Sequence, residues 1–63
     1  MFLESGQKVK AKRLLMLNTR KYCAPGAILT HLKSDGRVVV FENASGERFG
    51  IGKSVLERFV EVL

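Results

Sequence analysis

The sequence predicts an all-β fold, a five-stranded antiparallel barrel with one short helical turn before the last strand. Three observations lead to this prediction. Asp35-Gly36 stands before a β-prone run, and glycine accepts the positive φ that tight hairpin turns require. Asn43 to Gly46 repeats this turn chemistry after the run. In Gln7–Arg13, apolar and basic residues alternate with a period of two, which is typical of a half-buried strand.

The chain has 63 residues, which corresponds to a single domain over residues 1–63. A chain of this length buries only about 60% of its unfolded surface, so its core contributes little net stability. With one cysteine and one histidine, the chain has neither an intrachain disulfide nor a four-ligand zinc site to add stability. Association with a second copy remains as a source of stabilisation, and we therefore expect a homo-oligomer.

The first predicted strand, Gln7–Arg13, has Val9 and Ala11 on one face and lysines on the other. Leu14–Leu17 then interrupts the alternation with four apolar residues in succession, which must point to both faces. We expect something beyond the barrel interior to cover them.

Asn18–Cys23 is polar and basic and is predicted to form a loop, which Ala24-Pro25-Gly26 ends. The next predicted strand covers residues 27–32. Its two sides carry Ile28, Thr30 and Leu32, and Leu29 and His31, respectively. We expect His31 to point outward, near Lys33.

The central strand Val38–Phe41 is apolar on both faces, whereas a small antiparallel barrel needs one buried face per strand. The surplus apolar face indicates a contact with a subunit or partner, or a position under the long loop or the termini. Both faces qualify as the buried one. Arg48–Ile51 forms the next strand of the meander.

The C-terminal segment contains the one predicted helical turn, Val55–Arg58, with Ser54 near its N-cap. Phe59–Leu63 alternates again and is predicted to be the closing strand.

The net charge of +5 is unevenly placed. Residues 1–33 carry seven basic residues and one acidic residue, a net +6, whereas residues 34–63 carry four and five, a net −1. A basic half on a small domain is a plausible footprint for phosphate backbones, and it is also compatible with an ordinary solvated surface.

Several of these features together resemble the Src-homology-3-like small barrels, and within them the Tudor and KOW-type domains. The residues that carry the resemblance are Gly6-Gln-Lys-Val9, Tyr22 with Pro25-Gly26, Asp35-Gly36, Phe41, Gly46 and Leu56-Glu57. The resemblance implies a Src-homology-3-like barrel over nearly the whole chain.

Tudor domains hold methylated cations in a cage of about four aromatic side chains, and here only Tyr22, Phe41 and Phe49 could contribute. The KOW-type comparison, which implies RNA binding through basic loops and edges, fits better.

The best functional candidate is the basic segment that begins in the first strand. Lysines at alternate strand positions lie about 6.6 Å apart on one face, comparable to the spacing of successive phosphates. The predicted nucleic-acid-binding residues are Lys8, Lys10, Lys12, Arg13, Arg20, Lys21 and Tyr22, the last as a platform on which a base could stack. The alternative is that lysines on an exposed strand only prevent edge-to-edge aggregation.

Little in the sequence supports an enzymatic function. Gly50-Ile-Gly-Lys-Ser54 resembles part of a P-loop, but the first glycine of that motif would have to stand at Glu47. Nothing brings Cys23 and His31 together as nucleophile and base. We therefore expect no enzyme, no cofactor and no metal.

We expect a non-enzymatic protein that binds DNA or RNA mainly through the phosphate backbone. The alternative is a protein-interaction module, or a regulatory subunit that docks on a larger partner through the surplus apolar faces. An enzyme subunit whose site forms only across an oligomer is a third possibility. Apolar runs of at most four residues and an N-terminus without a signal pattern predict a cytoplasmic protein with no membrane partner.

Overall fold

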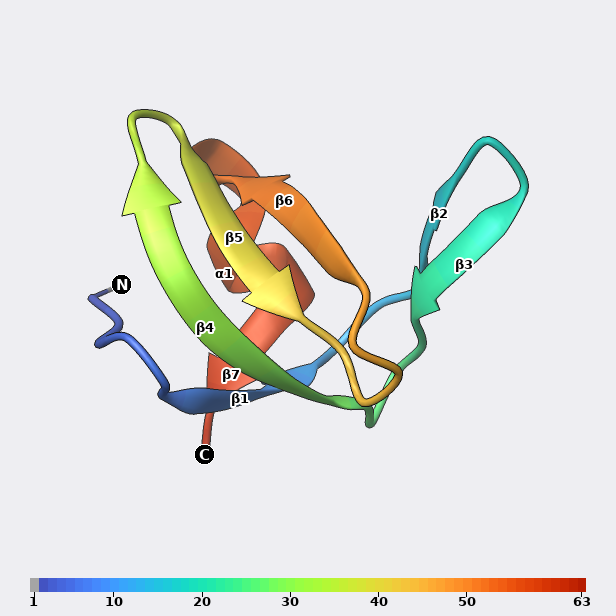
Figure 1. Ribbon diagram of the computed structural model, residues 1–63, viewed down its shortest axis with the longest axis horizontal. Coiled ribbons are helices and arrows are strands. Elements are labelled where there is room, and N and C mark those ends of the chain that lie inside the picture. Colours follow the sequence, from blue (N-terminus) through green and yellow to red (C-terminus); the bar gives the residue numbers. More distant parts are fainter. Residues whose placement is uncertain (1) are drawn as a thin grey trace.

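A computed structural model describes residues 2–63 and contains two β-sheets and a short helical segment (Figure 1). Along the chain the elements are β1 (Lys8–Ala11), β2 (Leu15–Leu17), β3 (Arg20–Cys23), β4 (Ile28–Asp35), β5 (Val38–Glu42), β6 (Arg48–Gly52), the 3₁₀ helix η1 (Lys53–Val55), α1 (Leu56–Phe59) and β7 (Val60–Val62). The mostly-β prediction is confirmed, as is the helical turn before the last strand.

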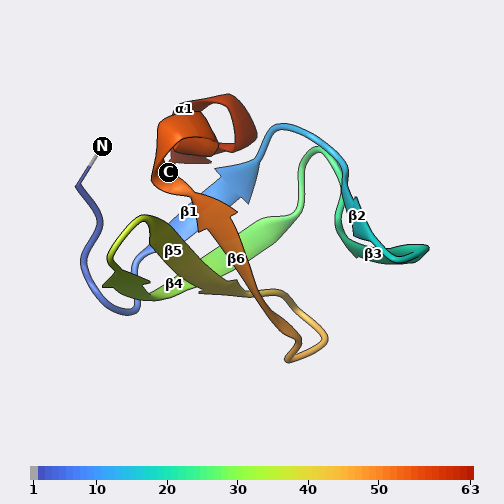
Figure 2. The same cartoon turned by 90° about the horizontal axis from the view of Figure 1, so that it is seen from above.

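The main sheet is antiparallel and has the strand order β6-β5-β4-β1-β7. It is open, with β6 and β7 at its edges, so the predicted closed barrel is wrong. The physical reason lies in the segment between the two edges. There α1 contacts the edge strands β6 and β7 and lies over one side of the sheet (Figure 2). The side chain of Leu56 on α1 is buried in the core. Side-chain packing therefore covers the core where a closed barrel would have hydrogen-bonded strands.

A separate two-stranded hairpin, β2–β3, projects beyond the main sheet (Figure 1). The prediction of a loop over Asn18–Cys23 is therefore wrong, because Arg20–Cys23 forms a strand against β2. The turn is made by Asn18 and Thr19, whose φ angles are +50° and +66°. Positive φ at both central residues is typical of a type I′ hairpin turn. The turn contains no glycine, and a β-branched threonine is strained at positive φ, so the sequence does not reveal this turn.

The core follows the alternation of the strands. Its fully buried large side chains are Phe41, Leu29, Val9, Val39 and Val60, each of which stabilises the fold by about 1.5–3 kcal/mol through removal from water. In β1, Val9 and Ala11 face this core, as predicted. In β5, Val39 and Phe41 point inward and Val38 is 42% exposed, which shows which face of the central strand is buried.

His31 points into the core, and the prediction that it faces outward is wrong. The residue is only 3% exposed, and its ring packs edge-on against Phe41 with centroids 5.8 Å apart. Its Nδ1 atom donates to the carbonyl oxygen of Glu4 at 2.8 Å, and Nε2 lies 3.3 Å from Oγ of Ser34. Because both ring nitrogens have partners, burial of this polar side chain is tolerated. The bond to Glu4 also ties the N-terminal segment to β4.

None of the helices in residues 2–63 has the length and apolarity needed to cross a lipid bilayer.

Gly50 on β6 offers a test of the outer face of the sheet. A Cβ atom built at this position would lie 2.5 Å from Cγ1 of Val38 on β5. We expect Gly50→Ala to cost about 1–3 kcal/mol in free energy of unfolding, because the stiff valine must move. In a Val38→Ala background most of this cost should disappear. Urea denaturation of the wild type, both single variants and the double variant measures the coupling. An equal cost of Gly50→Ala in the two backgrounds would contradict the contact.

Candidate nucleic-acid interface

The three predicted lysines of the first strand lie on one exposed face. Lys8 and Lys10 project from the outer face of β1, and Lys12 follows directly after the strand. β1 is an interior strand that pairs with β4 on one side and β7 on the other. Its backbone is therefore not available for edge-to-edge pairing, and protection of an edge does not account for these lysines.

The ammonium groups of this row have few competing partners. Nζ of Lys8 donates to Oγ1 of Thr30 at 2.6 Å, while Lys10 stands opposite Glu61 in the register of β1 and β7. Within residues 2–63, none of the three lysines forms an ion pair. Their positive charge therefore remains available to an anionic ligand.

Arg13 and the hairpin continue the basic surface. Nε of Arg13 donates to the carbonyl oxygen of Arg58 at 3.0 Å, which anchors the segment after β1 to α1. Arg20 on β3 forms an ion pair of 3.3 Å with Glu47, in which the arginine side chain is 64% exposed. Such a surface pair contributes at most about 1 kcal/mol, so a phosphate can compete with it. Lys21 is exposed and stands opposite Met16 in the hairpin.

Tyr22 is half-buried and belongs to the packing of the core. Its ring lies 5.4 Å from that of Phe49, which in turn lies 6.4 Å from Phe41. Phe41 and Phe49 are buried, so these three rings form a packed row within the structure. Only the outward side of Tyr22 is available for a base to stack on.

Asn43, which the sequence shows only as a turn residue, has a structural role in the site. Its Oδ1 atom accepts from the backbone N–H groups of Ser45 and Glu47, both at 3.0 Å. Its Nδ2 atom donates to the carbonyl oxygen of Tyr22 at 2.9 Å and to Oε1 of Glu47 at 3.0 Å. One side chain thus shapes the β5–β6 turn and attaches the β2–β3 hairpin to it. The position of Arg20 and Lys21 depends on this attachment.

Cys23 and His31 do not form a nucleophile–base pair. The Cys23 thiol donates weakly to the carbonyl oxygen of Arg13, at 3.7 Å, whereas the His31 ring bonds to Glu4 and Ser34. Burial raises the pKa of the Cys23 thiol above its ordinary value of 9.0, the opposite of what activates a nucleophile. Residues 2–63 contain no cluster of three or more side chains able to ligate a metal ion.

Comparison with known proteins adds no relative: no protein-family model, no curated protein and no solved structure matches the chain.

The environment of Cys23 predicts an unreactive thiol. Because its pKa is raised, the thiolate fraction at pH 8 is lower than that of an ordinary cysteine, and burial restricts access of the reagent. We expect Ellman's reagent to modify the native protein at least about tenfold more slowly than the protein unfolded in guanidinium. Absorbance at pH 8, with Cys23→Ser as a blank, measures both rates. Equal rates in the two conditions would contradict this burial.

Proposed function

We propose that this protein is a non-enzymatic nucleic-acid-binding protein that contacts mainly the phosphate backbone. The observation that carries the proposal is the row of exposed lysines on the outer face of an interior strand, which form no ion pair within residues 2–63. The basic surface consists of Lys8, Lys10, Lys12, Arg13, Arg20 and Lys21, with Tyr22 beside it.

The dimensions of this surface support phosphate contacts. Alternate residues of a strand lie about 6.6 Å apart, so the ammonium groups of β1 can follow successive phosphates. Beyond β1, the β2–β3 hairpin extends away from the sheet and carries Arg20 and Lys21 with it (Figure 1). Because phosphate contacts carry no sequence information, we expect low sequence specificity.

We infer a kinship of fold with the Src-homology-3-like domains, in an open form. An antiparallel meander, a hairpin between the first two strands of the main sheet and a helical turn before the last strand support this inference. The KOW-type comparison is consistent with the basic surface. The buried positions of Phe41 and Phe49 do not favour a methyl-lysine cage.

A second candidate is a protein-interaction module, and the observation that favours it is the apolar surface of the hairpin. Leu14, Met16 and Leu17 are 49%, 50% and 49% exposed, and nothing within residues 2–63 covers them. An exposed apolar patch of this kind is typical of a contact with another chain, including a second copy.

The nucleic-acid proposal is tested by fluorescence anisotropy with labelled duplex DNA, single-stranded DNA and RNA at two salt concentrations. We expect binding that weakens steeply with salt. Changing Lys8, Lys10 and Lys12 to Ala should weaken it by at least about tenfold, because three phosphate contacts are lost.

The matched control changes Lys33, Arg37 and Lys53 to Ala, which removes the same charge from residues outside the basic surface. This variant should bind nearly as well as the wild type. Equal losses in the two triple variants would show a response to net charge alone. Absence of binding at low salt, or binding without a salt slope, would refute the proposal.

The second candidate predicts self-association through the hairpin. If the apolar hairpin surface joins copies, size-exclusion chromatography with light scattering gives a multiple of 7.0 kDa. Leu14→Ser with Leu17→Ser should then return the mass to that of the monomer, because both side chains are half exposed and leave the core intact. Val38→Ser, on an exposed position of the main sheet, is the control. A monomeric wild type would exclude the homo-oligomer.

A further inference from the structure

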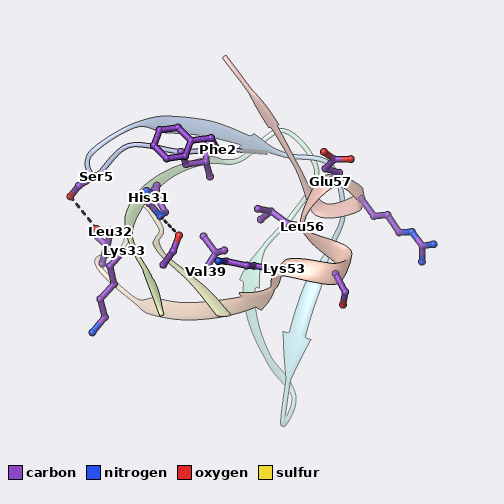
Figure 3. A pocket seen from close by; sticks show the side chains of 13 residues that line it. Phe2, Ser5, His31, Leu32, Lys33, Val39, Lys53, Leu56 and Glu57 are labelled. Atoms are coloured by element: carbon purple, nitrogen blue, oxygen red, sulfur yellow. Dashed lines mark hydrogen bonds between the residues drawn. The ribbon is translucent and has the colours of Figure 1, made fainter. Parts of the chain in front are cut away.

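A cavity of about 660 Å³ opens between the N-terminal segment, the end of β4 and the η1–α1 segment (Figure 3). This volume lies within the range of about 300–1,000 Å³ that is common for small-molecule sites. None of the residues of the proposed nucleic-acid surface lines the cavity. It is therefore a separate feature of the molecule.

The interior of the cavity is apolar and is built from the core itself. Leu3, Val39 and Leu56 line it, and all three are buried members of the hydrophobic core. Phe2 lines it from the N-terminal segment and is 86% exposed. A ligand with an apolar body would cover this ring and gain the free energy of removing it from water.

Several polar side chains in the wall already have partners within the protein. Oγ of Ser5 donates to the carbonyl oxygen of Leu32 at 3.0 Å (Figure 3). Both ring nitrogens of His31 also have partners. The wall combines these satisfied polar groups and three basic side chains with the apolar contact of the core residues. A peptide in this place would bring backbone N–H and C=O groups that need partners, which disfavours it.

Three basic residues line the cavity, and they are Lys33, Lys53 and Arg58. The Lys53 side chain extends across the cavity toward Val39, whereas Lys33 points away from it (Figure 3). The ammonium group of Lys53 has no hydrogen-bond or ion-pair partner within residues 2–63. Arg58 adds positive charge to the lining, whose one acidic residue, Glu57, is engaged in an interaction of its own. An anionic group on the ligand complements this arrangement.

We propose that the cavity binds an amphipathic carboxylate, an unbranched aliphatic acid of medium chain length. The carboxylate pairs with the Lys53 ammonium group, and the chain packs against Leu3, Val39 and Leu56 under the ring of Phe2. The site is independent of the basic surface on β1, so nucleic-acid binding and acid binding succeed or fail separately.

The experiment titrates decanoate, below its micelle concentration, into ¹⁵N-labelled protein and follows amide chemical shifts. We expect saturable shifts confined to the N-terminal segment, the end of β4 and η1–α1. Decanol, with the same chain and no charge, should bind at least about tenfold more weakly, because it lacks the charge-assisted contact. Binding of decanol with the affinity of decanoate would overturn the role of the carboxylate.

Two matched variants locate the head group. Lys53→Met keeps the length of the side chain, removes its charge, and should weaken decanoate by at least about fivefold. Lys10→Met, an equal loss of charge on the outer face of the sheet, should leave the affinity unchanged. Phe2→Ala removes an exposed ring without opening the core and should also weaken binding. No saturable shifts with decanoate, or equal effects of the two lysine variants, would overturn the proposal.

Discussion

A row of rings through the core holds the parts of this protein together. His31 packs against Phe41, Phe41 against Phe49, and Phe49 against Tyr22, with centroids between 5.4 and 6.4 Å apart. The row begins where the N-terminal segment bonds to His31 and ends at the base of the β2–β3 hairpin. Aromatic contacts of this kind contribute about 0.5–1.5 kcal/mol each beyond the area that they bury. In a domain this small, such contacts are a substantial part of the net stability.

The basic surface and the cavity share no residue and arise from different features of the fold. The lysines of β1 face outward because Val9 and Ala11 face inward, so the alternation that builds the core also creates the basic row. The cavity, in contrast, lies where core residues meet the N-terminal segment and α1. Because the sheet is open, a helical segment connects its two edge strands, and this segment brings Lys53 to the cavity.

Prediction from the sequence succeeded best for features that are set by residues adjacent in the chain. Asp35-Gly36 and Asn43–Gly46 form the turns that their chemistry predicts, and Gly36 and Gly46 have positive φ. The row of lysines followed from a period of two. The β2–β3 hairpin escaped prediction because its turn uses Asn18-Thr19 in place of a glycine. The inward direction of His31, the Asn43–Tyr22 bond and the cavity depend on residues distant in sequence, which no local pattern reveals.

The pairing of β1 with β7 has a consequence for how the chain acquires its structure. Val9 stands opposite Val62, so the first strand obtains one of its two partners only from residues 60–62. Such non-local pairing raises the contact order and slows folding, because the intervening chain must be ordered before the contact forms. Until residues 60–62 pair with it, β1 has one edge without a partner strand, and only the completed sheet removes that edge.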